Sequence, residues 1–259
     1  PTIDDSGDNP PTVQDGYQWL KDRTGDAFTR LRAVKAAETA PIIADDQFLH
    51  PIYRTFQQGV VRCLLSALDH LRFLVWSLEN RDSPYPDAQA TLIRTAITGA
   101  ATALWMADGA TPDERRRRAL EFNFNDLRSQ LAWIKTIVDD PKNQPLPPEE
   151  QTQHDNMVAE IEKRLDWIVQ QANIIVAPPN PFSRSRYKQQ LTTDTQVVLA
   201  AGAATPVLSA GGFDPAHVLS NTWQLLSGYA HARPWASLQG SRHIVKDPTP
   251  DPETGLITV

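Results

Sequence analysis

Apolar residues return every three or four positions along most of this chain. The clearest run lies between Gln47 and Asn80, where one seam is formed by Tyr53, Phe56, Val60, Leu64, Ala67, Leu71, Leu74 and Leu78. This spacing matches the turn of an α-helix, roughly 3.6 residues, and predicts a long amphipathic helix with one packing face. A chain patterned in this way buries its apolar residues by packing helix against helix, so we expect an all-α multi-helix bundle.

Proline-rich segments separate the periodic runs. Thr111, Pro112 and Glu114 supply a helix N-cap, a first-turn proline and a capping-box acid, so a helix is expected to start there. About seven helices are predicted in all, over roughly residues 12–41, 47–80, 88–107, 111–138, 149–177, 192–204 and 214–233.

No break in composition divides the 259 residues, so a single helical-bundle domain is expected over residues 12–240. Residues 1–11 lack apolar periodicity and are predicted to form a flexible N-terminal arm. In residues 241–259, two short apolar pairs flank a turn rich in proline, aspartate and glycine, which predicts a tail or a small β-hairpin.

The composition disfavours several classes of protein. With 41% apolar residues and a mean hydropathy of −0.40, the chain is expected to be a soluble globular protein rather than a membrane protein. A net charge of −6 opposes binding to duplex DNA and does not favour RNA. Cys63 is the only cysteine, so neither an intrachain disulfide nor a cysteine-based metal site is expected, and a reducing compartment, the cytoplasm, is predicted.

Motifs for the common cofactors are missing from the sequence. It contains no Walker-type phosphate loop, no Gly-x-Gly-x-x-Gly turn and no Gly-x-Ser-x-Gly nucleophile elbow. The paired Glu-x-x-His motifs of di-iron bundles are also absent, and Asp214-x-x-His217 is the nearest approach. We therefore expect neither a metal nor a cofactor.

Arg94 is the only charged residue in the segment 88–107, which is apolar or small on nearly every face and should form the most buried helix. A buried guanidinium needs an anionic partner. One interpretation is a structural salt bridge to a carboxylate such as Asp126 or Asp69. The other is a site that binds the carboxylate or phosphate of a ligand.

A second group of candidates ends the last predicted helix, in residues 227–235 (SGYAHARPW). Cations at a helix C-terminus interact favourably with the helix dipole, so capping alone would explain His231 and Arg233. If the fold brings His231 near Arg94, the two would form a polar pocket under an aromatic wall. His231 is also the candidate general acid or base, because an unperturbed imidazole has a pKa near 6.5.

Four consecutive arginines occupy positions 115–118. Glu114 and Glu121 stand four residues from Arg118 and Arg117, which is the spacing of stabilising ion pairs on a helix surface. We therefore expect a solvated helix face here rather than a nucleic-acid patch.

An Ile-Arg helix that ends in tryptophan, an Asp-Leu-Arg helix and a late Gly-Tyr-Ala-His segment together resemble uncharacterised helical proteins common in actinobacteria. The matching positions are Arg94, Trp105, Asp126, Arg128 and His231. Such proteins are similar in outline to HEPN-type and abortive-infection proteins, whose ribonuclease members use an arginine and a histidine close together on one helix. The resemblance implies a helical bundle and, as an alternative function, a ribonuclease or other hydrolase that uses His231. No arginine precedes His231 by a handful of residues in its helix, which departs from that pattern.

Residues 125–133 (NDLRSQLAW) resemble the second magnesium motif of class I terpene synthases, which are also all-helical. Trp133 stands where that family keeps a glutamate, and Asp45-Asp46 is the only counterpart of its upstream aspartate-rich motif. Magnesium held by carboxylates carries out diphosphate ionisation in that family, so this resemblance implies a degenerate, terpene-synthase-like protein at most.

The sequence therefore favours a ligand-binding or interaction protein over an enzyme, with a polar pocket that accepts an anionic group. The candidate ligand-binding residues are Arg94, Asp126, His231, Arg233, Trp105 and Trp235. The expected partner is a small anionic molecule or a protein, and a homodimer is compatible with the sequence. A structural scaffold without a small-molecule site is the remaining interpretation.

Overall fold

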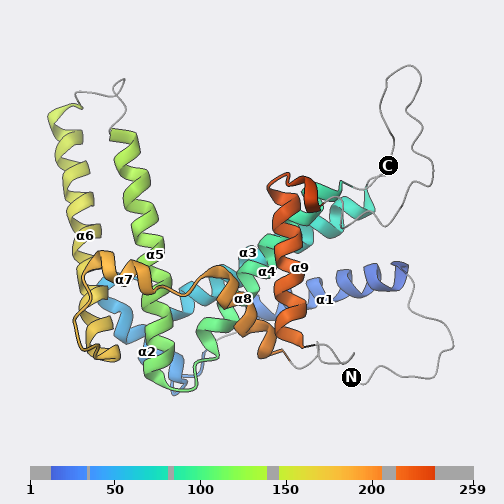
Figure 1. The fold of residues 1–259 in the computed structure, drawn as a ribbon, viewed down its shortest axis with the longest axis horizontal. Helices are drawn as coiled ribbons and strands as arrows, with labels where there is room; N and C mark the ends of the chain where they lie inside the picture. The colour runs from blue at the N-terminus through green and yellow to red at the C-terminus, as the bar shows by residue number, and fades with distance from the viewer. Residues whose placement is uncertain (1–12, 34–35, 81–84, 139–145, 206–213, 237–259) are drawn as a thin grey trace.

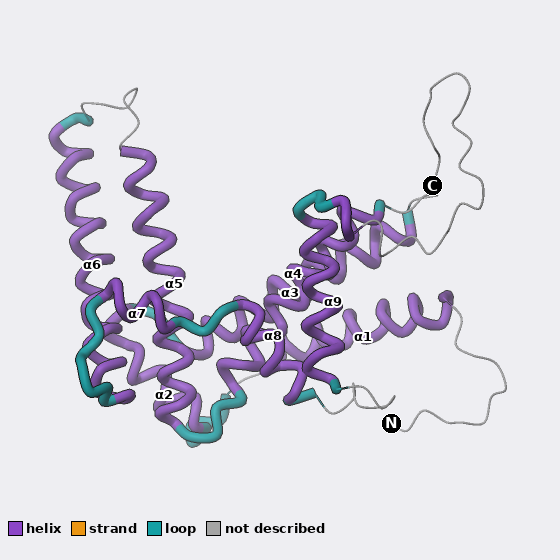
Figure 2. Tube along the Cα trace, in the orientation of Figure 1, coloured by secondary structure: helices purple, strands orange, loops and turns teal. Residues whose placement is uncertain are grey.

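The computed structural model describes residues 13–33, 36–80, 85–138, 146–205 and 214–236. Within these ranges the chain forms nine α-helices and one short 3-10 helix, and no strand (Figure 2). This confirms the all-α class. The predicted arm, residues 1–11, and the predicted tail or hairpin, residues 241–259, lie outside the described residues.

Helices α3 (Phe56–Glu79) and α4 (Pro86–Ala107) run along each other as a long pair (Figure 1). Their backbones come close at Gly99, where a Cβ atom would lie 2.7 Å from the carbonyl oxygen of Cys63. That distance is too short for any side chain, so glycine is needed at this point of the pair.

Helix α4 is the central helix, as its composition predicted. Besides α3, it packs against α5 (Pro112–Val138), α8 (Asp194–Ala203) and α9 (Pro215–Ala230), and α8 and α9 also pack on each other. Helix α1 (Val13–Ala33) packs on α3.

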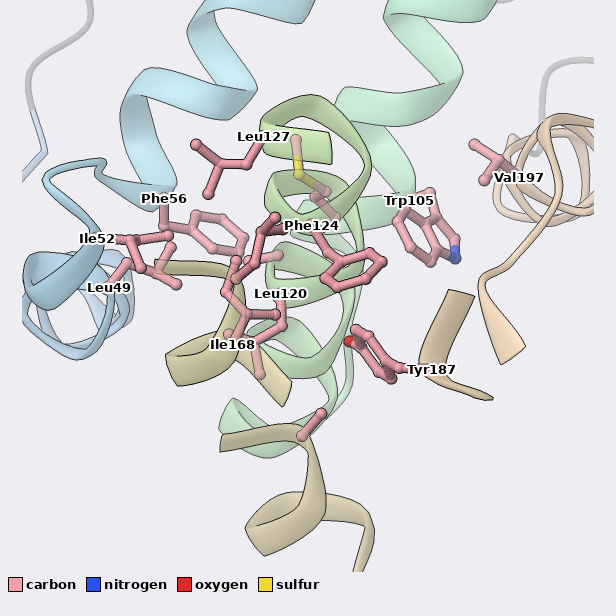
Figure 3. Close-up of a cluster of buried hydrophobic side chains, with 14 of the residues drawn as sticks. Leu49, Ile52, Phe56, Trp105, Leu120, Phe124, Leu127, Ile168, Tyr187 and Val197 are labelled. Atoms are coloured by element: carbon pink, nitrogen blue, oxygen red, sulfur yellow. The ribbon is translucent and has the colours of Figure 1, made fainter. Parts of the chain in front are cut away.

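Helices α5 and α6 (Pro148–Val176) stand side by side and project from the rest of the molecule (Figure 1). At their base they enclose a hydrophobic core together with α2 (Pro41–Leu49) and the start of α3. Figure 3 shows side chains from these elements converging, and the most deeply buried are Leu49, Ile52, Leu120, Leu127 and Ile168. Complete burial of one such side chain contributes about 1.5–3 kcal/mol.

The helix predicted over residues 47–80 is wrong at its start. Helix α2 ends at Leu49, a 3-10 helix covers His50–Ile52, and Tyr53 adopts a left-handed φ of 53° before α3 begins. The hydroxyl of Thr55 accepts from the backbone N–H of Gln58 at 3.0 Å, and the Gln58 side chain accepts from the Thr55 N–H at 3.2 Å. This capping box starts a new helix. Leu49, Ile52 and Phe56 face the same core on both sides of the break, whereas Tyr53, which was expected in the seam, is 70% exposed.

The helix predicted over residues 12–41 is wrong at its end, because α1 ends at Ala33 and residues 36–40 are not helical. The remaining boundaries follow the sequence more closely. Helix α5 begins at Pro112, and the Thr111 hydroxyl accepts from the N–H of Glu114 at 3.2 Å. In contrast, no helix was predicted between residues 177 and 192, yet α7 (Arg184–Gln190) lies there, capped by Ser183. Seven residues are too few to show an apolar repeat, so the sequence pattern missed this helix.

None of the described helices combines the length and the apolar composition that a membrane crossing requires.

Candidate functional site

Two pockets flank α5 where the α3–α4 pair meets it, each with a volume of about 560 Å³. The α3–α5 pocket lies between residues 54–65 and residues 122–126. The α4–α5–α8 pocket lies between residues 102–105, 121–129 and 188–197. Both volumes fall within the range of small-molecule sites, roughly 300–1,000 Å³.

Phe122 and Asp126, which lie one turn apart on α5, line both pockets. The Oδ2 atom of Asp126 lies 2.6 Å from Nη1 of Arg54, and Nη2 of Arg54 donates to the side-chain oxygen of Gln130 at 3.5 Å. Because both charged groups are partly exposed, this ion pair contributes less than about 1 kcal/mol to stability. Its main consequence is positional, since it ties the residues before α3 to α5 beside the α3–α5 pocket.

The α3–α5 pocket combines an apolar interior with a cationic rim. Its apolar surface comes from three side chains, Val61, Leu65 and Phe122. Arg54 and Arg62 carry two positive charges against the one carboxylate of Asp126, and Arg62 forms no ion pair within the described ranges. A net positive charge beside a partly enclosed apolar surface favours a ligand with an anionic head and an apolar body.

Cys63 lies on α3 next to Arg62 in the chain. Burial raises the pKa of its thiol to about 11, and the nearby Asp126 carboxylate acts in the same direction. The thiol is therefore neutral at pH 7, which makes it a poor nucleophile.

The α4–α5–α8 pocket combines an aromatic surface with a mixed polar rim. Trp105 and Phe122 supply the aromatic surface. Trp105 is held in place from outside the pocket, because the Arg118 guanidinium carbon lies 5.5 Å from its ring centroid and Arg118 also donates to its carbonyl oxygen. On the α7–α8 side the pocket presents Lys188 and Asp194, and neither is ion-paired with any residue that the structure describes.

Glu121 anchors the α7–α8 wall of this pocket to α5. It is buried, with one carboxylate oxygen paired to Arg117 and the other accepting from the backbone N–H of Thr192 at 2.9 Å. Nearby, Tyr187 packs edge-on against Phe124 with ring centroids 5.0 Å apart, and burial raises the pKa of its phenol well above the usual range. Buried contacts thus fasten the segment between α7 and α8, so the backbone that carries the lining groups has a defined position.

Two of the six residues predicted from the sequence, Asp126 and Trp105, line the α4–α5–α8 pocket. Arg94 lies elsewhere, in the contact between α4 and α9. Its Nε donates to the Ser227 hydroxyl at 2.7 Å, and its guanidinium carbon lies 5.0 Å from the Trp223 ring centroid.

No carboxylate of the described residues lies within ion-pair distance of Arg94, so the expected salt bridge is not formed. Asp126 pairs with Arg54 instead. The physical reason is that Arg94 is only half-buried. Water can still reach the guanidinium. One hydrogen bond to a hydroxyl and a cation–π contact with an indole therefore stabilise its charge without a counterion.

His231, Arg233 and Trp235 lie directly after α9, which ends at Ala230. His231 is the C-cap, Ala232 adopts a left-handed φ of 49°, and the Arg233 N–H donates to the carbonyl of Gly228 at 2.8 Å. Trp235 folds back over Gly228, where a Cβ would lie 2.8 Å from the indole. This geometry agrees with the capping interpretation, and His231 and Arg233 are exposed.

The four arginines at positions 115–118 do not form the fully solvated helix face that was expected. The predicted pairs of Arg117 with Glu121 and of Arg118 with Glu114 are present. Arg115 and Arg116, however, both bind Asp45, which is 0% exposed. All four side chains are half-buried, so this run joins α5 to its neighbours instead of facing solvent alone.

No family model, curated protein or solved structure matches the chain. Sequence reasoning missed Arg54, Arg62 and Asp194 as site residues, because Arg54 and Arg62 lie around the start of α3, Asp194 lies on α8, and no spacing in the sequence links them. The one available indication was the Thr55 capping box, which would have placed Arg54 and Arg62 around the start of α3.

Proposed function

We propose that this protein is a cytoplasmic, helical small-molecule-binding protein, and that the α3–α5 pocket holds an amphipathic molecule with one anionic head group. The observation that carries the proposal is the pairing of an apolar interior with two arginines and one carboxylate. The single cysteine of the chain supports a reducing compartment.

The anionic head would bind beside Arg62, whose guanidinium has no carboxylate partner within the described residues. Arginine suits this role because its planar fork can donate two hydrogen bonds to a carboxylate or phosphate. The apolar body would cover Leu65 and Phe122. This assignment keeps the anionic ligand expected from the sequence but moves it from Arg94 to the start of α3.

The test is a comparison of ligands with one body and different heads. Decanoate, decanol and decylamine are titrated into the full-length chain by calorimetry, and thermal unfolding is followed in parallel. Decanoate should bind and raise the unfolding temperature, because a ligand that binds only the native state stabilises it. Equal binding of decanol and decanoate would contradict an anionic head site.

Variants locate the site. Arg62→Gln should weaken decanoate binding by about tenfold, which corresponds to about 1.4 kcal/mol. Arg23→Gln is the matched control, because Arg23 is an exposed arginine on α1 away from both pockets. Loss of affinity in the control as well would indicate binding through overall charge.

A further inference from the structure

We infer that the α4–α5–α8 pocket is a second binding site, selective for a zwitterion that carries both an ammonium and a carboxylate group beside an apolar side group, as a free amino acid does. The inference rests on a pocket that differs in charge and composition from the α3–α5 pocket. It does not depend on the anionic ligand proposed for that pocket.

Some of the charged groups in this pocket are already ion-paired within the protein, and others are not. Glu121 is paired with Arg117, and Asp126 is paired with Arg54. Lys188 and Asp194 remain available, because each is exposed and no ion pair joins them to each other or to another described residue.

One free ammonium and one free carboxylate on the same wall are complementary to a ligand with both charges. Lys188 would bind the ligand carboxylate, and Asp194 would bind the ligand ammonium. A ligand with only one of these charges would leave one protein group without a partner, and it would lose the corresponding charge-assisted hydrogen bond.

The facing wall is suited to an apolar side group. Trp105 and Phe122 present aromatic surface there, and Val197 adds an aliphatic contact from the α7–α8 wall. Both walls are held in place before binding, since Arg118 packs over Trp105 and buried Glu121 accepts a hydrogen bond from the N–H of Thr192 on the α7–α8 wall. Groups held in place before binding lose little freedom when the ligand enters.

Three ligands with the same side group test this selectivity by calorimetry on the full-length chain: L-phenylalanine, its amide, which keeps only the ammonium, and N-acetyl-L-phenylalanine, which keeps only the carboxylate. Phenylalanine should bind at least about tenfold more tightly than either analogue. L-leucine is titrated as well, as a zwitterion with a smaller apolar side group. The inference would be overturned if neither amino acid bound, or if either analogue bound as tightly as phenylalanine.

Two variants test which protein group binds each charge of the ligand. Lys188→Met should abolish the preference for phenylalanine over its amide, and Asp194→Asn should abolish the preference over the acetylated form. Lys163→Met and Asp113→Asn are matched controls, because Lys163 is an exposed lysine on α6 and Asp113, like Asp194, lies in the first turn of a helix. Unchanged selectivity in both pocket variants would also overturn the inference.

Variants that fill one pocket with a larger side chain distinguish this site from the α3–α5 pocket. Val197→Trp, with its helical content verified by circular dichroism, should abolish phenylalanine binding and leave decanoate binding unchanged, whereas Leu65→Trp should do the reverse. If the protein binds phenylalanine but not decanoate, the proposal for the α3–α5 pocket is wrong and the amino-acid site is unaffected. If a folded Val197→Trp variant still binds phenylalanine, the inferred amino-acid site is wrong.

Discussion

Asp45 shows how one side chain can join elements that are far apart in the sequence. Its carboxylate is fully buried on α2 and lies 2.7 Å from Nε of Arg115 and 3.0 Å from Nε of Arg116 on α5. Asp45→Ala would leave two partly buried guanidinium groups without an anion, so the free energy of unfolding should fall by about 3–5 kcal/mol in a urea titration. Asp26→Ala, which removes an exposed pair with Arg30, should cost less than about 0.5 kcal/mol. Equal losses in the two variants would contradict a buried role for Asp45.

Cys63 gives a pH-dependent prediction at the same scale. Burial raises the pKa of its thiol from 9.0 to about 11, so at pH 8 the thiolate fraction is about a hundredfold lower than in the unfolded chain. Alkylation by iodoacetamide at pH 8 should be slower by a similar factor in the native protein than in urea. The native rate should keep rising with pH beyond 9, because the neutral thiol persists until the pH approaches 11. A native rate that levels off near pH 9 would show that the thiol is not shielded.

At the scale of the elements, glycine has opposite effects in two helices. In α4, a Cβ at Gly99 would meet the Cys63 carbonyl at 2.7 Å, so Gly99→Ala should lower the free energy of unfolding by about 1–3 kcal/mol through overpacking. In α1, nothing lies within 4 Å of a Cβ at Gly25, so Gly25→Ala should raise it by up to about 1 kcal/mol through helix propensity. Thermal and urea unfolding of the two variants measure both signs. A stabilising Gly99→Ala would refute the close approach of α3 and α4.

Helix boundaries illustrate what local sequence predicts well. The starts of α5, α8 and α9 follow from Thr111, Thr193 and Asp214, whose side chains each accept a hydrogen bond from the first turn of the helix. The start of α3 was missed although Thr55 and Gln58 form a full capping box, because apolar residues on both sides of the break, such as Ile52 and Phe56, face the same core. Periodicity shows which residues face the core, and two separate helices can share that face.

At the scale of the whole molecule, the projecting α5–α6 pair should differ in stability along its length. Its base packs against α2, the 3-10 helix and α7, whereas Trp133 is 63% exposed and Met157 is 51% exposed nearer the other end. Amide hydrogen exchange should therefore be faster in residues 135–138 and 149–157 than in residues 120–127 and 165–172, because few buried contacts oppose local opening. Mass spectrometry of peptides from these segments measures the difference. Uniform protection along both helices would indicate that another surface covers the far end.

The candidate site could be predicted only in part. The sequence pattern indicates Asp126 and Trp105, and both line a pocket. It also indicates Arg94, the one charge on an apolar helix, but the contact with α9 gives Arg94 a hydroxyl and an indole as neighbours. Which carboxylate faces which arginine depends on the packing of helices that are distant in sequence, and the chain offers many such pairings of similar energy.

The sequence by itself determined the all-α class, the central position of α4 and most helix boundaries, because turn periodicity, capping residues and prolines act over a few neighbouring residues. Only the tertiary structure decided where the pockets lie. Their walls combine Arg54 with Asp126, and Trp105 with Lys188, across tens of residues of chain. The spatial positions of these residues are set where the α3–α4 pair crosses α5. This crossing results from the packing of whole helices and leaves no local pattern in the sequence.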